Sequence, residues 1–163
     1  AKESISENIE RIVELLNKTN QFILSYRRYN ETEVIKLLNS KDSCIITAKM
    51  SDKLSDSGVI AILIAKKQNN DLFIDELTFS CRALGRNIED IVISKMFLMA
   101  KEFLNTSNNA LIDYKKGPRN LPALTWLENY TKEELKEEGC IKYLLKENIE
   151  MYGLEIKELC KIT

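Results

Sequence analysis

The first part of the chain carries apolar residues at three- and four-residue steps, the period of an amphipathic helix. This pattern predicts a helix over residues 4–17 and a shorter one over 31–39, which Asn30 or Thr32 can cap. Residues 17–29 lie between the two helices and are rich in amide, hydroxyl and guanidinium groups. We expect this segment to be too polar for the core, yet too dense in such groups for a plain linker.

The period then changes to that of strands. Residues 44–50 are β-rich, and residues 58–67 form a nearly continuous apolar run, which is typical of a strand covered on both faces. Residues 72–79 alternate apolar with acidic positions and follow a turn, so they should pair antiparallel with the preceding strand. The alternation predicts that either Asp75 or Glu76 is exposed, and one of them is a candidate general base.

Helices and strands alternate through the rest of the chain. The pattern predicts a long helix over 88–104 capped by Asn87, a buried strand over 110–114, a short helix over 120–129, a charged helical turn over 132–138, a strand over 141–145, and a tail over 148–163 that fits helix or strand equally. This order predicts an α/β fold in which helices flank both faces of a mixed, mainly antiparallel sheet.

Composition narrows the function classes. The 163 residues are 44% hydrophobic and 30% charged, with a formal net charge of −1. These values suit one globular domain over residues 1–163, and they argue against nucleic acid as a partner because nucleic-acid binders usually carry a basic excess. The sequence has no apolar run near the ~20 residues of a membrane span, so we expect no membrane association.

The chain has no histidine, which excludes Ser-His-Asp triads, Cys-His dyads and His-ligated zinc. Its four cysteines contain no CxxC pair, so we predict no metal site. An even number of cysteines permits two disulfides, but a domain of this size does not need them. We therefore expect free thiols and a cytoplasmic location.

The strongest candidate site is the loop between the strand at 72–79 and the helix at 88–104. Arg82 and Arg86 flank Gly85 there, and the loop amides are those of Ala83, Leu84, Gly85 and Asn87. Free amides before a helix, its dipole and two cations favour an anion, and a glycine lets the backbone approach a phosphate. A plain β–α turn with exposed arginines has the same sequence features, so both interpretations stand at this point.

The loop resembles motif A of the GNAT acyltransferase fold, whose pattern is Q/R-x-x-G-x-G/A. Arg82 and Gly85 match it, and Asn87 stands at its last position. Asn120-x-x-Ala123 resembles the next motif of that fold. The resemblance implies that residues 82–87 and Asn120 bind coenzyme A, and that its pantetheine lies where the strands at 72–79 and 110–114 separate. Leu127 stands where that family often has a tyrosine that acts as general acid for the leaving thiolate, and Tyr130 follows three residues later.

A narrower resemblance covers roughly residues 10–130. The runs Asn17-Lys18-Thr19-Asn20-Gln21-Phe22, Arg27-Arg28-Tyr29, Asp56-x-Gly58 and Ser80-Cys81-Arg82-x-Leu84-Gly85-Arg86 are similar to the C-terminal region of FkbH-like proteins. In those proteins a GNAT-like domain follows a HAD-superfamily phosphatase domain, and the protein loads a glyceryl unit onto an acyl carrier protein. The resemblance implies that this chain is the C-terminal part of such a protein, with the HAD-type domain and the carrier protein as partners.

The resemblance also suggests roles for single residues. Cys81 is a candidate nucleophile, and the alternative is that it is a buried small hydrophobic residue, as most free cysteines are. Cys44, Cys140 and Cys160 are expected to be structural. The residues expected to face the acyl group, the pantetheine or the carrier protein are Asn17, Lys18, Thr19, Asn20, Gln21, Arg27, Arg28, Lys116 and Arg119. For each of these, a capping or solvated role is the alternative.

Two functions follow from this sequence. The first is an acyltransferase-like domain that binds a phosphopantetheine thiol, on coenzyme A or on a carrier protein, and assists acyl or glyceryl transfer. The alternative is a non-catalytic module that docks the carrier protein. Cys81 beside the anion loop favours the first function, whereas Leu127 and the absence of histidine favour the second. The sequence makes no prediction about oligomeric state.

Overall fold

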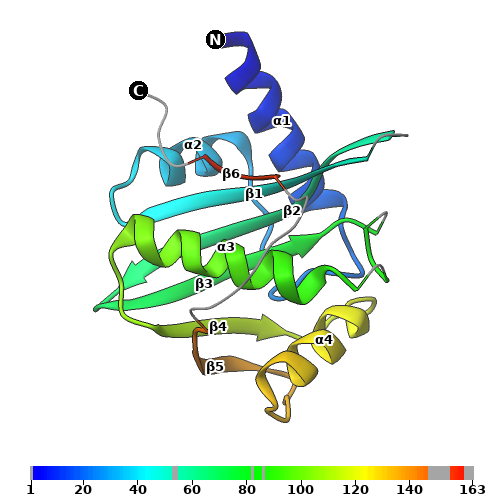
Figure 1. Ribbon diagram of the computed structural model, residues 1–163, viewed down its shortest axis with the longest axis vertical. Coiled ribbons are helices and arrows are strands. Elements are labelled where there is room, and N and C mark those ends of the chain that lie inside the picture. Colours follow the sequence, from blue (N-terminus) through cyan, green and yellow to red (C-terminus); the bar gives the residue numbers. More distant parts are fainter. Residues whose placement is uncertain (1, 53–54, 82, 86, 147–154, 160–163) are drawn as a thin grey trace.

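The computed structural model describes residues 2–52, 55–81, 83–85, 87–146 and 155–159, which build one sheet with helices on both faces (Figure 1). The helices are α1 (Lys2–Lys18), α2 (Glu31–Asn39), α3 (Glu89–Leu104) and α4 (Leu121–Thr131). The strands are β1 (Ser43–Asp52), β2 (Ser55–Gln68), β3 (Asp71–Phe79), β4 (Asn109–Lys115), β5 (Glu138–Leu144) and β6 (Glu155–Leu159).

The strand order is β5-β4-β3-β2-β1-β6. The pair β3–β4 is parallel, and the other neighbouring pairs of described strands are antiparallel. The helix α3 makes the crossover between β3 and β4 and lies in front of the sheet in Figure 1, whereas α1 and α2 lie behind it. The predicted α/β class, with a mixed and mainly antiparallel sheet flanked by helices, is therefore confirmed.

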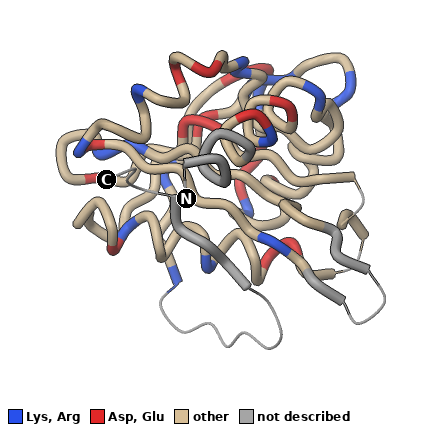
Figure 2. The backbone as a smooth tube through the Cα atoms, turned by 90° about the horizontal axis from the view of Figure 1, so that it is seen from above, with Lys and Arg blue, Asp and Glu red and all other residues tan. Residues whose placement is uncertain are grey.

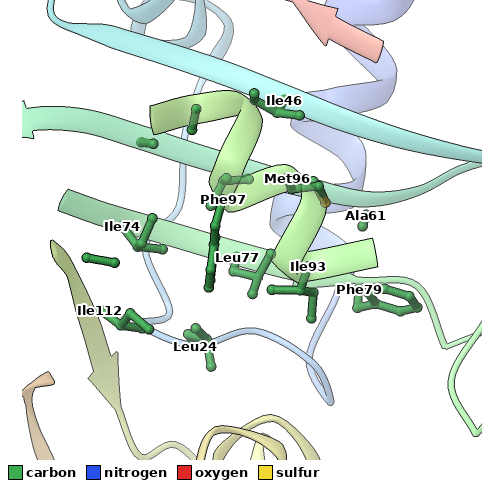
Figure 3. Close-up of a cluster of buried hydrophobic side chains, with 14 of the residues drawn as sticks. Leu24, Ile46, Ala61, Ile74, Leu77, Phe79, Ile93, Met96, Phe97 and Ile112 are labelled. Carbon is green, nitrogen blue, oxygen red and sulfur yellow. The ribbon is translucent and has the colours of Figure 1, made fainter. Parts of the chain in front are cut away.

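The central strand β2 is buried on both faces, as its apolar run predicts. Residues 60–64 are each no more than 1% exposed. Ala61 and Leu63 belong to the core on the α3 side, whereas Ile62 and Ile64 belong to the core under α1 and α2. Figure 3 shows the first of these cores, with Phe97 and its neighbours on α3 packed over β3 and the adjacent strands.

A β-bulge in β3 overturns the expected alternation. Ile64 of β2 pairs with Glu76 and Ala65 pairs with Ile74, so Asp75 is an extra residue in β3. The bulge lets Ile74 before it and Leu77 after it face the same core. Both Asp75 and Glu76 are consequently only 1% exposed, and the prediction that one of them is exposed is wrong.

Local rules predicted some helix ends correctly and others wrongly. The helix α2 has the predicted bounds and a capping box between Asn30 and Glu33. Asn87 does not cap α3: Ile88 is the N-cap, without a side-chain cap bond, and Asn87 adopts φ +58°. The helical turn predicted over 132–138 is absent, since α4 ends at the left-handed Lys132.

The C-terminal tail, which the sequence left ambiguous, contributes β6 at the edge beside β1. The rest of 148–163, including Cys160, lies outside the described residues. None of the described helices is long and apolar enough to cross a membrane.

Candidate functional site

The parallel strands β3 and β4 pair over a short stretch and then separate. Their paired residues are Leu72 with Ala110, Phe73 with Leu111, and Ile74 with Ile112. The bulge at Asp75 follows at once on β3, and both strands continue beyond it without pairing to each other. A gap in the sheet's hydrogen-bonding pattern therefore opens at the carboxyl ends of the two strands, where ligands often bind in α/β sheets.

Residues 22–27, here called the inserted segment, fill this gap from the β3 side. The segment lies between α1 and α2 in the sequence and runs antiparallel to β3 through a bridge between Ile23 and Thr78. The Phe79 amide donates to the Phe22 carbonyl at 3.0 Å, and the Leu24 amide lies 3.2 Å from the Leu77 carbonyl. The backbone edge that β3 would offer to another strand is thus already occupied here.

The inserted segment also reaches β4, where the Lys115 amide donates to the Leu24 carbonyl at 2.8 Å. Phe22, Ile23 and Leu24 are each no more than 1% exposed, and Figure 3 shows Leu24 among the core side chains. The expectation that this region is too polar for the core is therefore wrong for these residues. They are buried because the separated strands leave an apolar space between them.

Glu76 holds the inserted segment from the bulge. Its Oε1 accepts from the amides of Leu24, Ser25 and Leu77, each at 3.0 Å, and its Oε2 accepts from the Arg27 amide at 2.8 Å. Three of these four amides belong to the inserted segment. Glu76 therefore holds the inserted segment against β3 through backbone hydrogen bonds.

Ser25 adds a side-chain contact to this carboxyl group. Its hydroxyl lies 2.7 Å from the Asp75 carbonyl and 2.9 Å from Glu76 Oε2, and it can donate its one proton to either acceptor. Burial raises the pKa of Glu76, whereas the backbone amides and the Ser25 hydroxyl lower it.

Asn120 clamps the inserted segment from the other side. Its Nδ2 donates to the carbonyls of Ile23 and Lys115 at 2.9 and 2.8 Å, and its Oδ1 accepts from the Gly117 amide at 2.8 Å. The residue is 0% exposed. The prediction that Asn120 contacts coenzyme A stays untested, but each polar atom of its side chain already has a partner within the chain.

Asp75 anchors a cluster of charged groups that the sequence interpretation missed. It accepts from the Tyr29 hydroxyl in a short hydrogen bond, pairs with Arg27 at 2.5 Å, and lies 3.4 Å from the Lys66 ammonium. Arg27 also pairs with Asp113 on β4 at 2.6 Å. Burial, then the bond to Asp75, raises the pKa of Tyr29, which keeps the phenol protonated. The sequence singled out Asp75 and Glu76 as two adjacent carboxylates in an apolar strand, but it did not indicate their partners.

Arg28 closes the C-terminal end of α1. Its guanidinium donates to the Leu16 carbonyl at 2.6 Å and to the Asn20 Oδ1 at 3.0 Å. Cations are favourable beside the free carbonyls at a helix C-terminus. Asn17 donates to the Tyr29 carbonyl at 3.0 Å, so these predicted contact residues also support the start and end of the inserted segment.

The other predicted contact residues before the inserted segment are Lys18, Thr19 and Gln21, and the first two have partners on α1. Thr19 is buried, and its amide donates to the Leu15 carbonyl at 3.0 Å. Lys18 pairs with Glu14 on α1 at 2.9 Å, and Gln21 is exposed. None of these contacts tests a role in binding a partner, which stays a prediction.

The anion loop is only partly described, because Arg82 and Arg86 lie outside the described residues. Within the described part, the Ala83 amide donates to the Ser80 carbonyl at 3.0 Å, and the Gly85 amide donates to Glu89 at 2.6 Å. Gly85 adopts φ +78°, which explains the glycine without any close approach to a ligand. Two amides expected to face an anion therefore have partners within the chain.

The thiols differ in exposure. Cys81 is free and exposed just beyond β3, so it is not the buried hydrophobic residue of the alternative interpretation. Cys44 is free and buried, as expected, and Cys140 is free and exposed. Leu127, at the family's tyrosine position, is fully buried, and Tyr130 places its hydroxyl 2.5 Å from the Ser94 Oγ.

A hollow of about 480 Å³ opens beside the inserted segment, lined by Ser25, Tyr26, Arg27, Asp113, Tyr114, Lys115, Glu138 and Gly139. Its charges balance, and the Arg27 guanidinium in it is already paired with carboxylates. The described residues contain no group of three Cys, Asp or Glu side chains that could hold a metal ion.

Comparison with known proteins does not indicate a family for this chain. The chain matches no protein-family model, and no curated protein is similar enough in sequence to count as a match.

Proposed function

We propose that this domain is a recognition module that docks an acidic acyl carrier protein, built on a GNAT-like fold. The observation that carries the proposal is the inserted segment, which occupies the separated strands where the resemblance would put pantetheine. The resemblance to FkbH-like proteins supplies the partner, and the parallel β3–α3–β4 unit with separating strands supports the fold assignment.

Entry of a pantetheine arm would require the inserted segment to leave. Pantetheine amides would need the same β3 groups that Phe22 and Leu24 now use. Removing the segment would break its buried bonds to Glu76 and Asn120, each worth about 1 kcal/mol net, and would expose three apolar side chains. A cofactor of ordinary affinity would lose most of its binding free energy to that opening.

Two further observations support docking over catalysis. The Gly85 amide, a central donor of the expected anion loop, is bound by Glu89. The buried Leu127 stands where the family has its general-acid tyrosine, and the nearby Tyr130 hydroxyl is hydrogen-bonded to Ser94. A leaving thiolate would have no acid at the position where the family provides one.

The exposed Cys81 favours a second candidate function, acyl transfer through an enzyme thioester. Its sulfur would attack the carbonyl carbon of a carrier-bound thioester and form a new sulfur–acyl bond. The carrier thiol would leave and take up the proton that Cys81 had lost. The acyl group would then pass to an acceptor thiol by the reverse exchange.

Calorimetric titration separates the two functions. The domain is titrated with an acidic acyl carrier protein in its apo and 4′-phosphopantetheinylated forms, and with coenzyme A. Docking predicts that both carrier forms bind and that coenzyme A gives no heat. Failure of both carrier forms to bind contradicts the docking function.

Mass spectrometry after incubation with an acylated carrier tests the second candidate. Docking predicts no acyl-enzyme on the wild-type domain. An acyl adduct that Cys81→Ala removes, and that Cys140→Ala leaves in place, favours thiol catalysis, since Cys140 is the other exposed thiol among the described residues.

A further inference from the structure

We infer that the exposed turn of residues 115–122, which joins β4 to α4, is the surface that binds the carrier protein. This inference rests on the proposed docking function and specifies its site. The turn lies immediately beside the inserted segment, because Asn120 bonds to both.

The turn concentrates positive charge. Lys115, Lys116 and Arg119 are all exposed, and the sequence from residue 114 to 127 contains no Asp or Glu. Elsewhere basic and acidic residues are interspersed along the described backbone (Figure 2). Lys116 does pair with Glu137 at 3.3 Å, but both side chains are more than half exposed, so solvent screens this pair.

The same turn presents an apolar side chain. Leu121 begins α4 and is 69% exposed, and Pro118 and Pro122 on either side of it are also exposed. Protein interfaces commonly combine an apolar centre with a polar rim. Here the leucine would be the centre, and the ammonium and guanidinium groups would form the rim.

The turn is held rigidly by the protein beneath it. The Gly117 amide donates to Asn120, and Gly117 lies against the Tyr26 ring so closely that a Cβ would sit 2.1 Å from a ring carbon. The Arg119 amide lies 3.3 Å from the Tyr26 hydroxyl. A surface fixed in this way loses little conformational entropy on binding, which favours affinity.

Charge complementarity identifies the occupant as an acidic protein with an apolar recess on its binding face. The proposed carrier protein meets the first condition, and cationic rims also speed its association. Carboxylates lie near both basic regions: Glu128 and Glu137 line the hollow beside Lys116 and Leu121, and Glu33 and Asp42 line the hollow around Lys36, Lys66 and Lys67. The turn is the better candidate because residues 115–122 contain no carboxylate and because Leu121, at 69%, is more exposed than Ile35 beside Lys36, at 41%.

The test measures carrier binding by calorimetry for three variants. Lys115→Glu/Arg119→Glu reverses the charge of the turn, and Leu121→Ser removes its apolar centre. Lys36→Glu/Lys41→Glu makes the same charge change on exposed residues in α2 and just after it, and is the matched control. We expect each turn variant to weaken binding about tenfold or more, and the control to change it less than about threefold.

The outcomes separate the inference from the proposed function. If the wild-type domain does not bind the carrier, the proposed function is wrong. If it binds and the turn variants bind equally well, the inference is wrong while docking stands. Equal losses in the turn and control charge variants would also overturn it, since they indicate unspecific attraction. So would a wild-type dimer in sedimentation that Leu121→Ser dissociates, because the occupant would then be a second copy of the chain.

Discussion

Replacing Asn120 by alanine tests the clamp on the inserted segment. The substitution removes three hydrogen bonds of 2.8 to 2.9 Å and leaves two carbonyls and one amide without that partner. Each buried bond contributes about 1 kcal/mol net, and an unsatisfied buried group costs more. We therefore expect Asn120→Ala to lower the free energy of unfolding by about 3 to 4 kcal/mol, a large share of the stability of about 5–15 kcal/mol usual for a domain.

Urea denaturation measures this loss, and hydrogen exchange shows where it acts. The Lys115 amide, which donates to the Leu24 carbonyl, should exchange faster in Asn120→Ala because the inserted segment opens more often. Asn129→Ala, at an exposed position on the helix α4 that Asn120 precedes, is the control and should change stability by less than about 0.5 kcal/mol. A loss below about 1 kcal/mol for Asn120→Ala, with unchanged Lys115 exchange, would refute the clamp.

Three further substitutions probe the same region. Gly117→Ala should lower the melting temperature, because its Cβ would lie 2.1 Å from the Tyr26 ring and overpacking costs about 1–3 kcal/mol. Tyr29→Phe removes the hydroxyl bonded to the buried Asp75 and should cost about 2 kcal/mol in urea denaturation. Burial raises the pKa of Glu76 in the folded state. Protonation of Glu76 therefore stabilises the folded state fully at a pH below its ordinary pKa of about 4.3, and this stabilisation is lost as the pH rises through the folded-state pKa. The wild type should therefore lose stability with rising pH relative to Glu76→Gln, which does not titrate.

For each of these three predictions, a specific result would contradict the reasoning. Gly117→Ala should cost little in a Tyr26→Ala background, and an undiminished cost there would show that the ring is not the cause. Tyr29→Phe with unchanged stability would mean that the hydroxyl is dispensable to Asp75. For Glu76, parallel pH profiles of stability for the wild type and Glu76→Gln would show that burial does not raise its pKa in the folded protein.

Local patterns predicted much of the fold because local physics determines those elements. The capping box at Asn30 fixes the start of α2, and the apolar run of β2 reflects its burial on both faces. The charged run over 132–138 failed for a complementary reason. Its helix propensity has no apolar face to bury, so the chain extends toward the pairing of β5 with β4.

The site depended on contacts that sequence spacing does not report. The bulge at Asp75 is a property of the register between β2 and β3, and it buries two carboxylates that alternation would separate. The inserted segment is buried only because residues near Thr78 and Lys115 leave a gap for it. The resemblance suggests partner-binding roles for residues within 17–29, which stay predictions, and it gave no sign that part of this segment fills the gap.

Hydrogen exchange of the Leu24, Phe79 and Lys115 amides, with and without saturating coenzyme A, tests the central claim most directly. These amides lie in the contacts that hold the inserted segment between β3 and β4. A closed gap predicts the same slow exchange in both samples and no shift of their resonances. Altered exchange or shifts confined to these amides would show that the cofactor displaces the segment, and would contradict the claim that the gap is closed.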